Sequence, residues 1–281
     1  MRVLCLGKNS PDYLQDDVFH GLMSLDGVDV EHNVPFDYLF DDYAGDITEL
    51  YGRGVSYTRN ISSIRKHVVD AYEIFGKLCD HYYDAVIYLS IRRCATYFDD
   101  VSRLLSPNHI ALIDGEDDIA IFPHAGYRNF KRELTIAPSS DLLPISFAIP
   151  ESKLCHDMPE KLRLISEEIP RCDRNYAFSR EVDYYREYQT SRFAITHKRA
   201  GWDCKRHYEI LANRCVPIFR DIEACPPYTL MTLLKKMLAN IEHSWPSLSD
   251  ADYREINVAL YEYTKAHLTT KHLAQYVLES L

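Results

Sequence analysis

Short, continuous apolar runs alternate along the chain with segments in which apolar residues recur every three or four positions. Continuous runs of this length are typical of buried parallel strands, and the longer spacing is typical of helices that cover a sheet. The order strand, helix, strand over most of the chain predicts an α/β protein with parallel sheets. The strands are expected at residues 2–6, 28–32, 84–90, 109–113, 192–196 and 216–219.

Helical spacing of apolar residues predicts helices between and after these strands. A further short helix is expected where Phe130 and Leu134 stand four residues apart. Residues 35–58 are acidic, aromatic and irregular, which fits either a mobile loop beside a binding site or a solvated insertion. The longer helices are expected at residues 14–25, 61–78, 98–105, 180–188, 202–213, 230–241, 253–263 and 268–281.

The chain is long enough for two medium domains. Three prolines between residues 137 and 150 mark a crossing from one domain to the next. We expect a first Rossmann-like domain over residues 1–145, a second over 146–260, and a last helix within 261–281. The first domain lacks the G-x-G-x-x-G fingerprint after its first strand, so its sequence gives little support for dinucleotide binding there.

The run KRAGWDCKRHYEILANRCVPIF, residues 198–219, predicts the end of a strand, a turn at Gly201, a helix and another strand. One helix face is apolar and should lie on the sheet. The opposite face carries Trp202, Arg206, Glu209 and Asn213, which are spaced so that they share one side of the helix.

This turn and helix have the chemistry of an anion site. Lys198 and Arg199 precede the turn, and Gly201 allows a close backbone approach to the unpaired N–H groups that begin the helix. Two cations at such a place favour a phosphate or diphosphate, and Glu209 can accept hydrogen bonds from ribose hydroxyls. The simpler interpretation is a surface helix with an Arg206–Glu209 pair.

Charged residues also follow the strands of the first domain, at the sheet edge where open α/β sheets bind ligands. The cluster Asp114-Gly115-Glu116-Asp117-Asp118 fits three interpretations: a general base whose pKa is raised by its neighbours, a metal site, or an acidic turn and helix cap. Asp12 lies in the loop after the first strand. Lys131 and Arg132 either face a diphosphate across a cleft or pair with nearby acids.

Composition and missing motifs exclude several classes of function. A formal net charge of −10 argues against a general nucleic-acid or anionic-membrane binder, and no segment approaches the roughly 20 apolar residues of a membrane span. The eight cysteines include no C-x-x-C pair, so we expect free thiols in a reducing compartment and a soluble, cytoplasmic protein. P-loop, G-x-S-x-G and zinc-deaminase motifs are absent.

The pattern G-W-D-C-x-R-H-Y-E-I-L-A-x-x-C-x-P-x-F, from Gly201 to Phe219, with Asp221-Ile222-Glu223-Ala224-Cys225-Pro226 after it, resembles the donor-site segment of exostosin-like glycosyltransferases. Chain length and flanking segments are similar to those of a small chlorovirus β-xylosyltransferase. Many members of the family have Gly where this chain has Arg214, so the turn after the helix is where this chain departs from the pattern.

The resemblance implies a GT-B fold, in which two Rossmann-like domains face each other across a cleft and a final helix crosses back to the first. It implies an inverting transfer of a sugar, with UDP-xylose as donor and a glycan as acceptor; if the chain is viral, it would act in the host cytoplasm. Because the cations and the helix N-terminus can stabilise the departing diphosphate, no cofactor is expected and no metal need be present. Glu209 would bind the donor ribose, and Asp117 or Asp12 would act as the base. The expected donor-binding set is Lys131, Arg132, Lys198, Arg199, Gly201, Trp202, Arg206, His207 and Glu209.

Two other classes of function stay open from the residues alone. One is a non-catalytic module that binds a glycan or a nucleotide. The other is a metal-dependent transferase or hydrolase that uses Asp114, Glu116 and Asp117.

Overall fold

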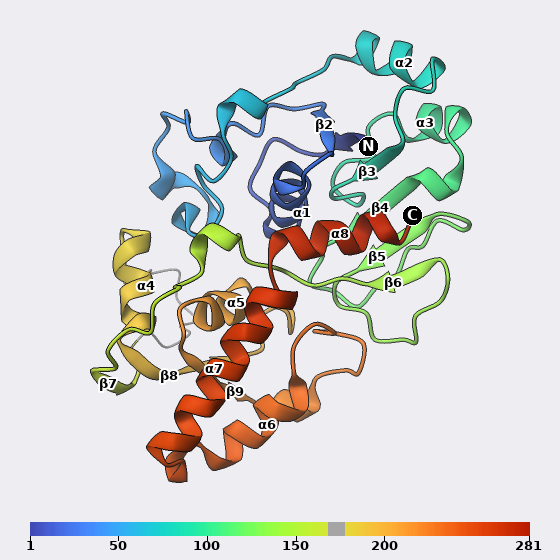
Figure 1. The fold of residues 1–281 in the computed structure, drawn as a ribbon. Helices are drawn as coiled ribbons and strands as arrows, with labels where there is room; N and C mark the ends of the chain where they lie inside the picture. The colour runs from blue at the N-terminus through green and yellow to red at the C-terminus, as the bar shows by residue number, and fades with distance from the viewer. Residues whose placement is uncertain (168–177) are drawn as a thin grey trace.

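The computed structural model describes residues 1–167 and 178–281, which form two α/β units, each around a parallel sheet (Figure 1). Every strand pairing within the two sheets is parallel, as the continuous apolar runs predict. The six-stranded sheet has the order β2-β1-β3-β4-β5-β6, and the three-stranded sheet the order β7-β8-β9. Their bounds are β1 (Arg2–Leu6), β2 (Asp29–His32), β3 (Ala85–Tyr88), β4 (Ile110–Asp114), β5 (Arg128–Lys131), β6 (Leu142–Pro144), β7 (Arg163–Ile165), β8 (Ser191–His197) and β9 (Val216–Arg220).

The six-stranded sheet is covered on both faces. Side chains of a strand point alternately to its two faces, so Val3 and Cys5 of β1 belong to one core, and Leu4 and Leu6 belong to another. The first core receives α1 (Tyr13–Ser24), and the second receives α2 (Ala71–Cys79) and α3 (Phe98–Leu104).

The second unit contains the strand–helix–strand segment expected around Gly201. β8 leads through a turn into α5 (Lys205–Ala212), which returns to β9 beside β8. Tyr208 and Leu211 of α5 are buried, as the apolar stripe predicts. The remaining helices of this unit are α4 (Glu181–Gln189), α6 (Lys235–Ser244) and α7 (Asp250–His267).

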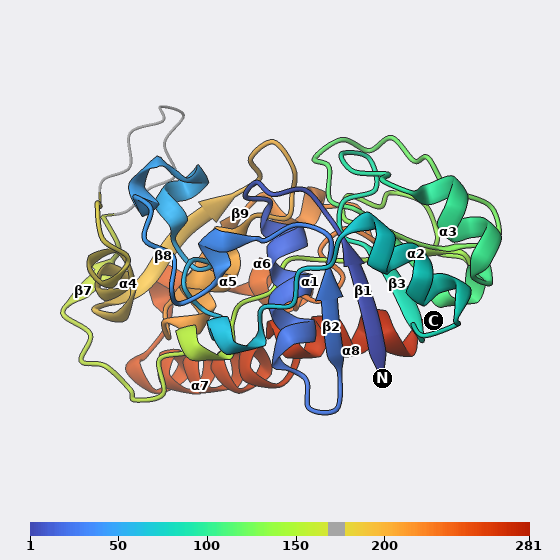
Figure 2. The same ribbon diagram turned by 90° about the horizontal axis from the view of Figure 1, so that it is seen from above.

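The last helix, α8 (Thr270–Glu279), leaves the second unit and packs along α1 of the first (Figures 1 and 2). Ala274 and Val277 are fully buried in the same core as Val18. A Cβ on Gly21 would collide with the backbone of Thr270, so the glycine allows the two helices to approach closely. α8 therefore completes a core that begins at the first strand.

One of the expected helices is wrong, and two begin late. Within residues 61–78 the α-helix begins only at Ala71, after a short 3-10 helix at Ser63–Arg65, because the backbone of His67 and Val69 hydrogen-bonds to His32 beside the sheet, and Asp70 caps α2. The expected helix around Phe130 is strand β5, which lies between β4 and β6. The helix expected from residue 230 begins only at Lys235.

Arg214 adopts the left-handed conformation, with φ of 52°, directly after α5. Many exostosin-like glycosyltransferases have glycine at this turn, whereas in this chain Arg214 makes it. Its guanidinium donates to the carbonyls of Cys155, at 2.8 Å, and His156, at 2.9 Å, and lies 3.5 Å from the ring centre of Tyr261. These contacts offset the cost of the backbone conformation.

The cysteines within the described residues are free thiols, as expected, while Cys172 lies outside the described residues. Among the described helices, none has both the length and the apolar character that a bilayer crossing requires.

Candidate functional site

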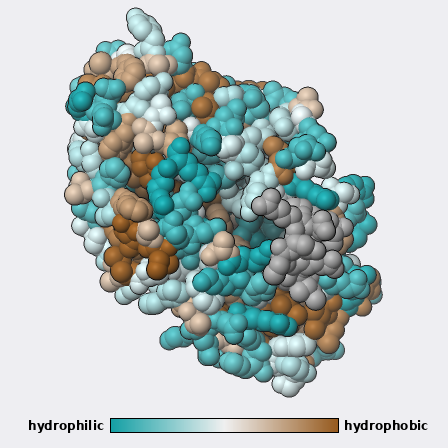
Figure 3. Space-filling model, turned by 180° about the vertical axis from the view of Figure 1, so that it is seen from behind, coloured by the Kyte–Doolittle hydropathy of each residue, from teal (hydrophilic) through white to brown (hydrophobic). Residues whose placement is uncertain are grey.

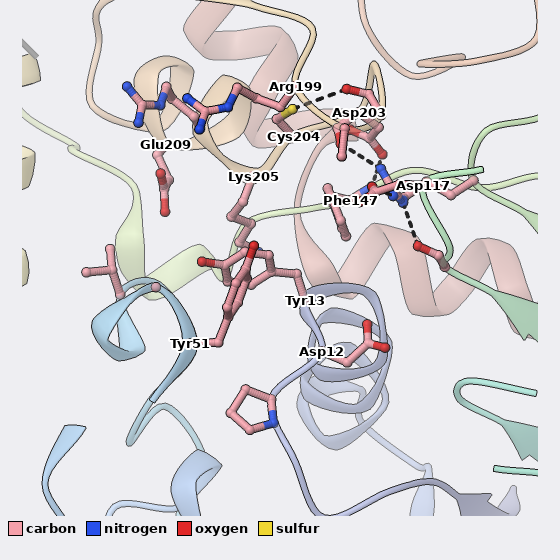
Figure 4. Close-up of a pocket in the computed structure, with 18 of the residues that line it drawn as sticks. Asp12, Tyr13, Tyr51, Asp117, Phe147, Arg199, Asp203, Cys204, Lys205 and Glu209 are labelled. Carbon is pink, nitrogen blue, oxygen red and sulfur yellow. Dashed lines mark hydrogen bonds and ion pairs between the residues drawn. The ribbon is translucent and has the colours of Figure 1, made fainter. Parts of the chain in front are cut away.

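A pocket of about 480 Å³ opens between the two units (Figure 4). The first unit contributes the loops that follow β1 and β4, together with the segment 51–55. The second contributes the turn after β8, the side of α5 that carries Lys205, Arg206 and Glu209, and α4. Its volume is within the usual range for small-molecule sites, and its place at the ends of β1 and β4 is where open α/β sheets bind ligands.

The lining of the pocket is more basic than acidic, although the whole chain has a formal net charge of −10. Polar residues also dominate the face of the molecule drawn in Figure 3. A positively charged, partly enclosed pocket in an acidic protein favours an anionic small molecule over an extended polyanion. The basic lining residues are Arg53, Arg93, Arg132, Arg199, Lys205 and Arg206, and the acidic ones are Asp12, Asp117, Asp203 and Glu209.

The turn before α5 is shaped by Glu133 of the first unit. Gly201 lies against this carboxylate, and a Cβ at residue 201 would be 2.5 Å from Glu133 Oε1. The same oxygen accepts the backbone N–H of Asp203 at 3.0 Å. The glycine is therefore required by the packing of the two units, and one of the amides that was expected to bind the anion is already bonded to Glu133.

Glu209 is buried but lines the pocket, and Figure 4 shows its carboxylate extending from α5 into the open space. Oε2 accepts the hydroxyl of Tyr184 at 2.8 Å, and Oε1 accepts the hydroxyl of Ser56. Arg199 and Arg206 line the same side of the pocket. The structure thus brings together the carboxylate and two of the cations that the sequence singled out.

Four members of the expected donor-binding set do not line the pocket. Lys131 is buried in the first unit, 3.2 Å from Asp114, so it pairs with a nearby acid. Lys198 lies over the ring of Trp202, 5.5 Å from its centre. His207 is buried between Thr196 and the carbonyl of Trp202, each at 2.9 Å, and burial lowers its pKa to about 3. His207 is therefore neutral and supports the turn from within.

Arg132 lines the pocket, yet its guanidinium is fully engaged in holding the two units together. It donates to the carbonyl of Gly115 in the first unit, at 3.0 Å, and to that of Asp203 in the second, at 2.6 Å. It also forms ion pairs with Asp117 and Glu133. The plane of Phe147 covers the guanidinium, 4.5 Å from ring centre to Cζ. Such a residue positions the walls of the pocket.

Both carboxylates expected as a general base line the pocket on the side of the first unit. Asp12 caps α1, accepting the N–H of Leu14 at 3.2 Å, and lies 2.9 Å from Arg93. Asp117 is paired with Arg132, but its side chain is 55% exposed. The geometry leaves both residues as candidates.

Within the acidic cluster, the pKa values of Glu116 and Asp118 are lowered, whereas one interpretation of the sequence expected crowding to raise the pKa of an acid there. Arg93 hydrogen-bonds to Glu116 and lowers the pKa of its carboxyl, and Arg92 does the same to Asp118. The nearby cations outweigh the repulsion between the acids. Within residues 1–167 and 178–281, the one grouping with metal-ligand spacing is Glu31, His67 and Glu73, which is outside the pocket lining.

Three site features were missed in the sequence. Lys205 forms a buried ion pair with Asp17 of α1. Asp203 is fully buried, and its burial raises its pKa to about 7. Ser56, from the acidic insertion of the first unit, hydrogen-bonds to Glu209 of the second. Of these features, the sequence could have indicated only Asp17. It is a charged residue on the face of α1 that the apolar spacing assigns to the core.

No family model matches the sequence, and no curated protein matches it either. Among solved structures, the chain is similar to the crystal structure of MurG from Acinetobacter baumannii, with a TM-score of 0.40 and 12% sequence identity over 99% of each chain. Two parallel α/β units face each other across the pocket, and the last helix returns to the first unit, which is the GT-B type of arrangement that the resemblance of residues 201–219 implies.

Proposed function

We propose that this protein is a glycosyltransferase that moves a sugar from a nucleoside diphosphate to a hydroxyl of a glycan. The observation that carries the proposal is Glu209 in the pocket, with Arg199 and Arg206 on the same wall. A carboxylate beside two arginines provides acceptors for ribose hydroxyls and donors for a diphosphate. A pocket of about 480 Å³ has room for a ligand of that size.

In this proposal the wall formed by α5 binds the donor. The diphosphate lies by the guanidinium groups of Arg199 and Arg206 and the beginning of α5, where the helix dipole is positive. Charge that develops on the departing diphosphate is stabilised by these groups, so the step requires no metal. Glu209 binds the ribose, as the resemblance of residues 201–219 to exostosin-like glycosyltransferases implies.

The opposite wall binds the acceptor. Asp12 or Asp117 accepts the proton of the acceptor hydroxyl. The acceptor oxygen then forms a bond to the anomeric carbon while the bond from that carbon to the diphosphate oxygen breaks, which inverts the configuration. Tyr13 and Tyr51 line this wall, with ring centres 5.3 Å apart, and offer apolar surface to a sugar.

We further propose xylose as the transferred sugar and UDP-xylose as its donor. Support for this finer assignment comes from the resemblance of the segment from Gly201 to Phe219 and of the chain length to a small chlorovirus β-xylosyltransferase. The pocket itself supports the nucleoside diphosphate more directly than it supports the identity of the sugar.

Calorimetry with UDP and UDP-xylose tests the proposal. The wild-type protein is expected to bind both, and Glu209→Ala is expected to lose most of the affinity while remaining folded. Unchanged binding by Glu209→Ala would remove the proposed site. Transfer to a glycan acceptor, followed with labelled UDP-xylose, separates an enzyme from a non-catalytic binding module. Loss of transfer in EDTA would favour a metal-dependent reaction.

A further inference from the structure

Ser56 belongs to the first unit, yet its polar groups contact the second. Its side chain is fully buried, and its hydroxyl lies 2.7 Å from the hydroxyl of Tyr185 and donates to Glu209 Oε1. Its backbone N–H donates to Glu181 Oε1 at 2.6 Å, while Lys153 holds the other oxygen of Glu181 at 2.7 Å. Ser56 is thus held against α4 and α5 by three hydrogen bonds.

The two oxygens of Glu209 are held by different elements. Ser56 donates to Oε1 from the first unit, and Tyr184 of α4 donates to Oε2 at 2.8 Å. A carboxylate oxygen can accept two hydrogen bonds, so each oxygen keeps capacity for one more. Because both oxygens are held, the plane of the carboxylate is fixed while it faces the pocket (Figure 4).

The backbone of Ser56 is in a conformation that favours glycine. Its φ is 73°, and Arg53, three residues earlier, has φ of 54°. Residues other than glycine keep such a positive φ only where the surrounding structure holds them in it, and such residues cluster at functional sites. A serine kept at this position supplies a hydroxyl that glycine cannot.

We propose that Ser56 is a positioning residue that orients Glu209 for the ribose of the donor. The inference rests on the proposed function and adds that the second unit needs the first in order to bind the nucleoside. The carboxylate of the second unit is oriented only while the segment 51–56 of the first unit is in contact with it. Binding of the nucleoside therefore depends on contact between the two units, whereas binding of phosphate by Arg199 and Arg206 does not.

Calorimetry with two ligands separates this role from a general structural one. UDP presents ribose and diphosphate, and inorganic pyrophosphate presents only the charged part. Ser56→Ala is expected to weaken UDP binding about tenfold, the effect of losing a hydrogen bond to a charged group, and to leave pyrophosphate binding unchanged. Ser62→Ala is the matched control, because Ser62 is an exposed serine nearby whose side chain caps no helix.

A double-mutant cycle with Glu209→Ala, which removes the acceptor of the Ser56 hydroxyl, completes the test. If Ser56 acts through Glu209, Ser56→Ala has no further effect on UDP affinity in the Glu209→Ala protein. Additive losses, or an equal loss for UDP and pyrophosphate, would show that Ser56 only anchors its segment and would overturn the inference. Unchanged or tighter binding of UDP by Ser56→Ala would overturn it as well.

The proposed function fails in a different way. If the wild-type protein binds neither UDP nor UDP-xylose, the donor site itself is wrong, and the inference falls with it. If the wild type binds UDP and Glu209→Ala weakens it, but Ser56→Ala does not, only the inference is lost. Should Ser56→Ala fold poorly, Ser56→Gly removes the hydroxyl and relaxes the backbone, and the same loss of UDP affinity is expected.

Discussion

The two walls of the pocket carry charge in different ways. On the wall from the first unit each acid lies beside a cation: Asp12 and Glu116 share Arg93, and Asp117 is paired with Arg132. On the wall from the second unit, Glu209 is held by hydroxyl groups, and two arginines line the same side. Acids that are neutralised by neighbouring cations suit an uncharged acceptor, whereas a carboxylate held by hydroxyl groups can accept further hydrogen bonds from the hydroxyls of a ribose.

The largest effect is expected from removing the base on the first wall. Asparagine keeps the size of aspartate and can also cap a helix, so Asp117→Asn and Asp12→Asn should both remain folded. One of the two is expected to lower kcat by roughly 10²–10⁴-fold, the usual contribution of a general base. The other should change kcat by less than about tenfold. UDP affinity, measured by calorimetry, should be unchanged in both, and full activity in both would place the base elsewhere.

A pair of arginine variants compares the walls directly. Arg206→Ala is expected to weaken UDP binding by about 10–100-fold, because charge-assisted hydrogen bonds to the diphosphate are lost. Arg93→Ala removes the same charge from the opposite wall and should change UDP affinity by less than about threefold, because Arg93 is already paired with Asp12 and Glu116. Equal losses in the two variants would mean that the walls do not divide donor from acceptor.

Sequence patterns predicted the second wall better than the first. The strand, glycine turn, helix and strand around Glu209 are close together in the chain, so spacing alone predicted β8, α5, β9 and the face that bears Arg206. Ser56 was missed because it is 153 residues away from its partner Glu209, and no local pattern reports such a contact.

The errors have the same physical origin. Apolar spacing between residues 61 and 70 resembles a helix, but the backbone pairs with His32 beside the sheet, and Ile64 is 94% exposed. Lys131 was expected to reach a diphosphate, but its strand directs it to Asp114, at 3.2 Å. The charge of a residue could be read from the sequence, whereas the partner of that charge is set by tertiary contacts.

A pH series tests whether Asp203, which is buried where the two walls meet, holds a proton in the folded protein. Burial raises the pKa of Asp203 to about 7, from an ordinary value of 3.8. Between about pH 4 and 7 the folded state holds a proton that the unfolded state has released, so the contribution of Asp203 to stability falls as the pH rises. The slope for one proton is at most about 1.4 kcal/mol per pH unit.

Asp203→Asn isolates this contribution. The free energy of unfolding, measured in urea between pH 4 and 8, should fall more steeply with pH in the wild type than in the variant. The lowered pKa of buried His207 acts in the opposite direction but is common to both proteins, so it cancels in the difference. Parallel curves for the two proteins would show that Asp203 is ionised throughout.

The smallest effect is expected at the turn that ends α5, which sets the end of the second wall. Arg214→Gly relaxes a residue with φ of 52° but removes the bonds to Cys155 and His156, so stability should change by less than about 1 kcal/mol. Arg214→Ala loses the same bonds and keeps the strained backbone, so urea unfolding should show a larger destabilisation, about 1–2 kcal/mol. Equal losses would mean that the conformation costs nothing.

The packing of α8 on α1 has a consequence for how the protein is made. Ala274 and Val277 fill a core that also contains Val3 and Val18, so residues at opposite ends of the sequence meet there. During translation the ribosome releases α1 long before α8. The first unit therefore carries an uncovered apolar face until residues 270–279 have emerged, and during that time the face is exposed to non-native contacts.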